Sequence, residues 1–96
     1  MSWAAVNNGL TNLYVKAIAF KGNTHIFVGT KGGGVFRSTN SGVNWIESNT
    51  GIWFWDITAL FVTQDGDLIA GTNGGGIYRT SDNALTWLHK DFKRRW

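Results

Sequence analysis

Apolar and β-branched residues occur in short runs along this chain, separated by turns rich in glycine, asparagine and aspartate. In the two most apolar runs, residues 15–20 and 57–62, nearly every position is apolar. Such a short run is typical of a strand that is buried on both faces. The pattern predicts eight short strands, at residues 15–20, 24–30, 35–39, 44–48, 57–62, 68–72, 77–81 and 86–90.

This strand pattern repeats with a period of 42 residues, marked by Trp3, Trp45 and Trp87. Laying residues 3–44 over residues 45–86 without a gap gives ten identical pairs. The first members of the pairs are Trp3, Asn7, Gly9, Ala17, Gly29, Thr30, Gly32, Gly33, Gly34 and Arg37. Four antiparallel strands in every repeat of about 40 residues are typical of a β-propeller blade. The sequence therefore predicts an all-β chain of two propeller blades.

The residues between the third and fourth strands of each unit resemble the Asp-box, the bacterial neuraminidase repeat S-x-D-x-G-x-T-W. The copies read Ser-Thr-Asn-Ser-Gly-Val-Asn-Trp at residues 38–45 and Thr-Ser-Asp-Asn-Ala-Leu-Thr-Trp at residues 80–87. Four positions depart from the motif, namely Asn40, Asn44, Thr80 and Ala84. Ala84 stands where the motif has a glycine in a left-handed conformation, which is costly for alanine. The resemblance covers nearly the whole chain and implies a sialidase-like propeller.

In Asp-box families the motif is a structural hairpin at the edge of the blade, and the resemblance implies the same role here. A short carboxylate or amide side chain accepts hydrogen bonds from backbone N–H groups of its own turn. The tryptophan packs against the sheet. We therefore expect structural roles for Ser38, Asn40, Gly42, Trp45, Thr80, Asp82, Thr86 and Trp87.

Sialidase activity is the catalytic function that this resemblance brings with it, and the residues argue against it. Such activity implies an arginine cluster, yet Arg37 and Arg79 occupy the same position of the two repeats. A catalytic set should break the repeat symmetry. No catalytic triad or metal-ligand spacing is present, and the chain has no cysteine. We predict no enzyme, no metal and no cofactor, and a sialidase-like hydrolase ranks last among the functions considered.

The largest difference between the units is a Trp-Phe-Trp loop at residues 53–55, which replaces Thr-Asn-Leu at residues 11–13. Trp53 and Trp55 with the amides of Asn49 and Asn73 predict a candidate ligand site, in which the aromatic rings stack on a sugar. A carbohydrate-binding lectin that uses this loop is therefore the alternative function. We favour the other interpretation, in which the aromatic residues pack against a neighbouring blade or the N-terminal segment.

The net charge of +3 comes from the last seven residues, because residues 1–89 hold five basic and five acidic side chains. A neutral body with a basic tail at residues 90–96 lacks the basic face that nucleic-acid binding needs. The tail fits an anionic partner or a solvated terminus, and we favour the terminus. We also expect no membrane span, because every apolar run is too short, and no signal peptide.

Two blades cannot close a propeller ring, which uses about four to eight. A blade of this size has faces of ~300 Å² each, so two open faces would expose ~600 Å². We therefore predict that residues 1–96 form one two-blade fragment that closes a ring with copies of itself, and acts as a binding or scaffold module. A trimer of six blades is favoured, and a tetramer comes next. A natural module, a piece of a longer array and an engineered chain all fit this pattern.

The outer, tryptophan-bearing strand is present three times, at residues 2–6, 44–48 and 86–90, whereas the inner strands are present twice. A closed ring has room for two outer strands per chain, so one copy is surplus. We predict that residues 86–90 fill the outer position, because they follow their own hairpin and pair at low entropic cost. Trp3 would then lie on the ring surface or against a neighbouring chain, near Trp53 and Trp55.

Overall fold

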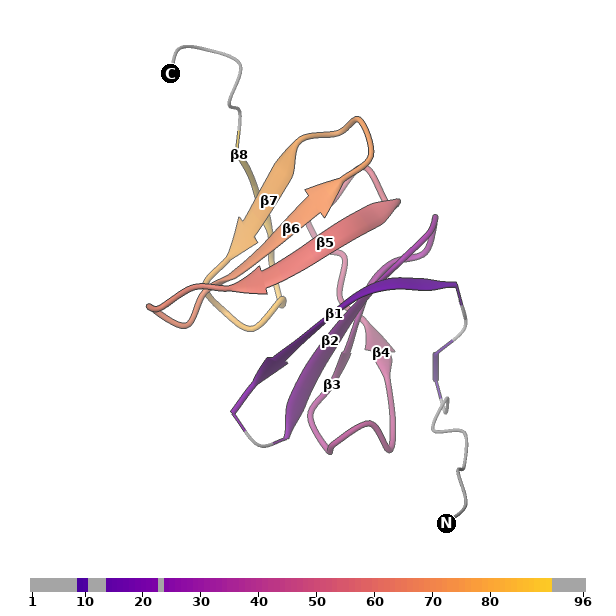
Figure 1. Cartoon of the computed structure of the whole chain (residues 1–96), viewed down its shortest axis with the longest axis vertical. Coiled ribbons are helices and arrows are strands. Elements are labelled where there is room, and N and C mark those ends of the chain that lie inside the picture. The colour runs from indigo at the N-terminus through magenta and orange to yellow at the C-terminus, as the bar shows by residue number, and fades with distance from the viewer. Residues whose placement is uncertain (1–8, 11–13, 23, 91–96) are drawn as a thin grey trace.

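The computed structural model describes residues 9–10, 14–22 and 24–90, which form two four-stranded antiparallel sheets (Figure 1). The first sheet consists of β1 (Val15–Lys21), β2 (His25–Thr30), β3 (Gly34–Ser38) and β4 (Ile46–Glu47), in that order. The second consists of β5 (Ile57–Val62), β6 (Leu68–Thr72), β7 (Ile77–Thr80) and β8 (Leu88–Lys90). The all-β prediction is confirmed. Within the described residues no helix is long and apolar enough to cross a membrane.

The sequence repeat is also a structural repeat. In the first sheet Ile18 lies opposite Val28, and in the second Leu60 lies opposite Ala70, each 42 residues further along. The register shift after the first residue of β1 recurs after the first residue of β5. Equivalent positions of the two sheets can therefore be compared residue by residue.

The outer strands are shorter than predicted. β4 has two residues and β8 has three, so the prediction that Trp45 and Trp87 lie within them is wrong. The reason lies in the preceding turns, where side chains hold the N–H groups of Asn44 and Thr86. β8 pairs with β7 in the outer position. The other candidate for that position, residues 2–6, lies outside the described residues, as do Trp3 and residues 91–96 of the tail.

Each sheet has two faces, which we call front and back. The front of the first sheet carries Ala19, Phe27 and Val35, and the same repeat positions of the second sheet are Phe61, Ile69 and Ile77. The back of the second sheet carries Leu60, Val62, Leu68, Ala70 and Tyr78, and the same repeat positions of the first sheet are Ile18, Phe20, Ile26, Val28 and Phe36.

The main core lies between the front of the first sheet and the back of the second. It joins Phe27 and Val35 to Leu68 and Tyr78, with Leu60 packed against its edge. β1 and β5 lie beside each other where the sheets meet (Figure 1). β2 also approaches β5 at Gly29, where an added Cβ would lie 2.8 Å from Cβ of Ile57. A glycine at this position allows β2 and β5 to come this near.

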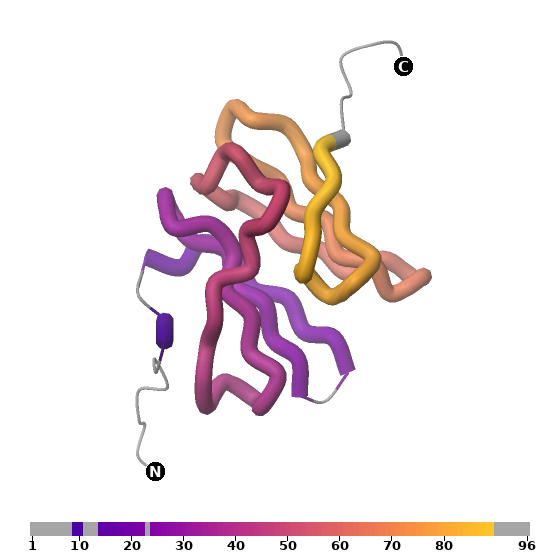
Figure 2. Tube along the Cα trace, turned by 180° about the vertical axis from the view of Figure 1, so that it is seen from behind, coloured from indigo at the N-terminus to yellow at the C-terminus, as the bar shows by residue number. Residues whose placement is uncertain are grey.

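The connection between the sheets contributes to the same core. Figure 2 shows it passing from the first sheet to the second. Its Ile52 packs in the main core beside Trp87. At the same repeat position Leu10 packs on the back of the first sheet, against a smaller cluster that contains Trp45. The back of the first sheet is thus built like the back of the second, but no other sheet formed by the described residues lies on it.

The innermost strands are buried on one face only, so the prediction of burial on both faces is wrong for the single chain. In β1, Ala19 is 8% exposed, whereas Ile18 and Phe20 are 53% and 62% exposed. In β5 the pattern is reversed, because Val62 packs against the core and Phe61 is 60% exposed. A position that is open in one sheet is covered in the other.

Candidate functional site

The turn between β3 and β4 is held by its own side chains. Ser38 Oγ accepts hydrogen bonds from the N–H groups of Asn40 at 3.3 Å and Gly42 at 2.8 Å. Asn40 Oδ1 accepts one from Asn44 N–H at 3.0 Å and one from the Ser38 hydroxyl at 2.9 Å. Ser38 Oγ and Asn40 Oδ1 are therefore engaged within the turn, which is a structural role.

The turn between β7 and β8 uses a carboxylate for the same purpose. Asp82 accepts hydrogen bonds from the Thr80 hydroxyl at 2.6 Å and from the Thr86 N–H at 2.9 Å, and the Thr86 hydroxyl donates to its second oxygen. These bonds, from Thr80 first and then Thr86, lower the pKa of Asp82 to about 2. Ala84 is fully buried with a φ of 70°, so it adopts the left-handed conformation of the glycine that it replaces.

Both tryptophans that end these turns are buried, Trp45 being 7% exposed and Trp87 3%. Trp87 Nε1 donates a hydrogen bond to Ser48 O at 2.7 Å, and its backbone N–H donates to Thr50 O at 2.8 Å. Trp87 therefore fastens the connection between the sheets to the second sheet. Its indole is part of the core and cannot stack on a ligand.

The aromatic loop lies between the glycine triplets of the two sheets. Gly34 N–H of the first sheet donates to Trp55 O at 2.9 Å, and the Trp55 indole donates to Ile52 O at 2.8 Å. On the other side the Phe54 ring covers Gly75 so closely that a Cβ there would overlap it. Trp53 is 85% exposed, although its N–H donates to the Tyr78 hydroxyl at 3.2 Å. The loop backbone is thus held while one indole is left in solvent.

The two amides predicted for the ligand site hold parts of the fold. Asn49 Oδ1 accepts from Val35 N–H at 2.7 Å, and its Nδ2 donates to Gly33 O at 3.3 Å. Asn73 Nδ2 donates to Asp56 Oδ2 at 3.2 Å. Asn49 and Trp55 both contact Gly34. The Asn49 side chain occupies the space where a Cβ of residue 34 would lie, and the Trp55 carbonyl accepts the Gly34 N–H. The structure brings Asn49, Trp55 and the first glycine triplet together, but both amides already have protein partners.

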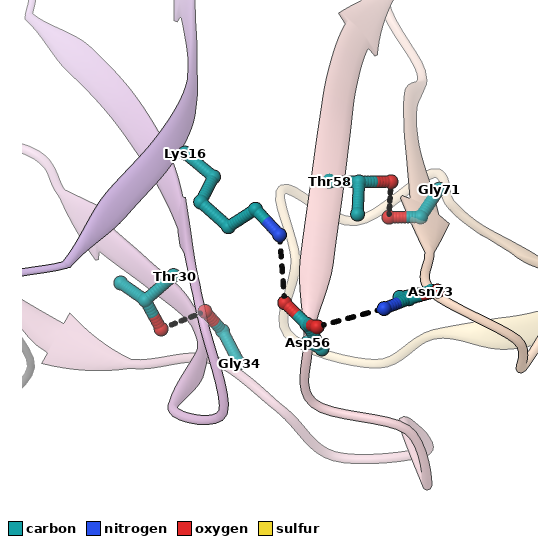
Figure 3. Close-up of polar contacts among 7 residues, drawn as sticks. All are labelled: Lys16, Thr30, Gly34, Asp56, Thr58, Gly71 and Asn73. Atoms are coloured by element: carbon teal, nitrogen blue, oxygen red, sulfur yellow. Dashed lines mark hydrogen bonds and ion pairs between the residues drawn. The ribbon is translucent and has the colours of Figure 1, made fainter.

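An ion pair links the two sheets near the start of β5 (Figure 3). Lys16 Nζ of β1 lies 3.2 Å from Asp56 Oδ1, just before β5. The hydrogen bond from Asn73 is the largest cause that lowers the pKa of Asp56, and Lys16 adds to it. Lys16, Phe54 and Asp56 were not among the predicted site residues, although Phe54 belongs to the aromatic loop. All three could have been found in the sequence as departures from the repeat, because the residues 42 positions away are Thr58, Asn12 and Tyr14 respectively.

Arg37 and Arg79 occupy equivalent positions of the two sheets. Arg79 forms an ion pair with Asp67 at 2.8 Å, and Arg37 lies opposite Phe27 in the first sheet. In the part of the chain that the structure describes, no three His, Asp or Glu side chains are grouped so that they could share a metal ion.

No family model, curated protein or solved structure matches the chain. Its function therefore has to follow from the faces and contacts of the two sheets. Among the described residues, exposed apolar side chains include Phe20 and Phe61 on the outward faces of the two sheets and the ring of Trp53.

Proposed function

We propose that this chain is a non-enzymatic β-propeller building block that associates with copies of itself to close a ring and serves as a binding or scaffold module. A single observation carries the proposal. On the innermost strands, apolar positions that are covered where the two sheets pack are exposed at the two ends of the chain, as Phe61 and Phe20 illustrate with 60% and 62% exposure, whereas Val28 and Phe36 on the back of the first sheet are already buried. A second copy would cover them as the chain covers its own.

The size of the open faces supports association. Sheet faces of this width have at most ~300 Å² each, and on the back of the first sheet and the front of the second the innermost strands are open, as Ile18 and Phe61 show. Each open face is thus of the size of the contiguous apolar patches that often mark interaction sites. Burial at about 25 cal/mol per Å² gives up to roughly 15 kcal/mol, before the entropic cost of association. The apolar surface is therefore sufficient to favour assembly.

The number of copies follows from the number of blades. Each chain provides two sheets, so two, three or four copies give four, six or eight blades. The Asp-box resemblance favours six, which is the usual number in sialidase-like rings, and hence a trimer. A tetramer of eight blades is the next choice.

Light scattering at micromolar concentration tests the proposal. The proposal predicts a mass of three copies of the 10.6 kDa chain, with four copies as the next choice. A folded β-sheet spectrum together with a mass of 10.6 kDa would contradict self-association. The variant Phe61→Lys should lower the mass, whereas Val43→Lys should not, because Val43 is equally exposed but lies in the β3–β4 turn.

A lectin is the second candidate, and the exposure of Trp53 favours it. An indole that is 85% exposed on a loop with a held backbone is suited to stacking on a sugar ring. A glycan array would test this function. Reproducible binding that Trp53→Ala removes and Val43→Ala preserves would support a lectin, and the absence of binding would leave the loop a packing element.

A further inference from the structure

Resting on the proposed self-association, we infer that the copies pack head to tail. The front of the second sheet of one copy covers the back of the first sheet of the next. The register is that in which the two sheets of one chain already pack. The partner at each end is therefore a second copy of this chain, and the two contacting surfaces are different.

The burial of equivalent positions supports this arrangement. Ala19 on the front of the first sheet is covered, while Phe61 at the same position of the second is 60% exposed. Val62 on the back of the second sheet packs against the core, while Phe20 at the same position of the first is 62% exposed. On the innermost strands, each end thus exposes positions whose equivalents in the other sheet are covered. Packing of two fronts would leave both backs uncovered.

The contact between β2 and β5 inside the chain sets the expected register between copies. Gly29 of the first sheet meets Ile57 of the second, and 42 residues separate these positions from Gly71 and Val15 respectively. Gly71 of one copy should therefore meet Val15 of the next. Space is present, because a Cβ at Gly71 would have Ala59 Cβ at 3.7 Å as its nearest neighbour. Val15 is exposed in the single chain.

The contact between copies should differ from the contact inside the chain in its polar groups. Inside the chain Lys16 pairs with Asp56, and Lys21 Nζ donates to Asn83 Oδ1 at 2.6 Å. The equivalent pairs between copies are Thr58 with Tyr14, and Thr63 with Ser41. None of these four side chains is charged at neutral pH. The contact between copies is thus apolar at its centre and lacks ion pairs.

The size of one contact favours a closed ring over an open chain of copies. Two faces of ~300 Å² bury ~600 Å² in total, which is less than the roughly 1,000 Å² of a stable protein interface. In a closed ring every copy makes two contacts, and the last contact forms within one assembly at a high effective concentration. Intermediates with a free end should therefore be scarce.

Two variants with one cysteine each test the arrangement, because the chain has none of its own. Val15→Cys and Gly71→Cys are refolded separately and as an equal mixture, and then oxidised. Head-to-tail packing predicts a disulfide between one chain of each kind in the mixture, identified by intact mass, and no cross-link in either variant alone. Because the equivalent Cβ atoms inside the chain would lie 2.8 Å apart, the strands must separate by about 1 Å to form the bond, and a short bismaleimide linker is therefore used in parallel. A cross-linked dimer of a single variant, or an oligomer of the mixture that neither oxidation nor the linker joins into the mixed dimer, would overturn the inference.

The masses of Phe61→Lys and Ile18→Asp provide a second test that does not depend on a disulfide. Head-to-tail packing needs both surfaces, so each variant should lose the closed assembly while keeping its β-sheet spectrum. If two identical faces met instead, one of the variants would remain a dimer and the inference would be wrong. An unaltered chain that is a monomer would overturn the proposed function as well, whereas an oligomer with identical faces in contact would overturn only the head-to-tail arrangement.

Discussion

Replacement of Trp87 by alanine should be the most damaging single change in the second sheet. The indole is 3% exposed and belongs to the core between the sheets. Truncation of a buried tryptophan costs about 3–5 kcal/mol. A domain of this length has roughly 5–14 kcal/mol of stability in total. Trp87→Ala should therefore remove a large fraction of the free energy of unfolding.

Trp87→Phe separates packing from hydrogen bonding. Phenylalanine keeps an aromatic ring in the core but removes the Nε1 donor, which lies 2.7 Å from Ser48 O. A buried carbonyl that loses its partner costs about 1–3 kcal/mol. The matched control is Trp53→Ala, which removes an indole that is 85% exposed and should change the free energy of unfolding by less than about 0.5 kcal/mol.

Thermal unfolding followed by circular dichroism measures these differences. All variants must be compared at one protein concentration, because association makes Tm depend on concentration. With about 4–8 °C per kcal/mol for a chain of this size, Trp87→Ala should lower Tm by roughly 12 °C or more, and Trp87→Phe by about 4 °C or more. A Tm for Trp87→Ala within a few degrees of that of Trp53→Ala would refute the assignment of Trp87 as an anchor.

Three further predictions follow from single contacts. Because the pKa of Asp82 is lowered from 3.8 to about 2 in the folded state, its ionised carboxylate stabilises the fold fully above pH 3.8 and loses this effect as the pH falls towards 2. In acid unfolding, Asp82→Asn should therefore lose less stability over this range than the unaltered chain. An unchanged loss would contradict the role of the Asp82 carboxylate in its turn. Gly51→Ala should lower the free energy of unfolding, measured in urea, by more than Gly74→Ala does. Both residues have positive φ, but of the two only Gly51 would bring a Cβ against a backbone carbonyl, that of Trp87. Equal losses of stability would contradict this packing. Lys16→Met should lower the free energy of unfolding by at most about 1 kcal/mol, and by less at high salt. A loss of stability that does not depend on salt would show that the ion pair with Asp56 does not cause it.

The repeat made most of the fold predictable from the sequence. Because a gap-free shift of 42 residues aligns the apolar positions, one reading of strands and turns served both sheets. The outer strands were overestimated because hydrogen bonds from Asn44 and Thr86 belong to the turns. Such competition between a turn and a strand for the same N–H group depends on side-chain geometry, which a residue pattern does not contain.

The candidate site was predictable only in part. The Trp-Phe-Trp loop was found because it departs from the repeat, and its indole at Trp53 is indeed exposed. The roles of the two amides were not predicted: Asn49 holds the glycine-rich turn between β2 and β3, and Asn73 donates a hydrogen bond to Asp56. An amide side chain fits a ligand site and a turn equally well in sequence. Only the distances to backbone groups distinguish the two roles.

Sedimentation velocity over a range of concentrations tests the central claim most directly, because it reports the mass of every species present. A closed ring predicts the 10.6 kDa chain and one larger species, three copies in mass, with no dimer between them. A single species of 10.6 kDa at all concentrations, or a ladder of sizes that grows with concentration, would contradict closure of a ring by identical copies.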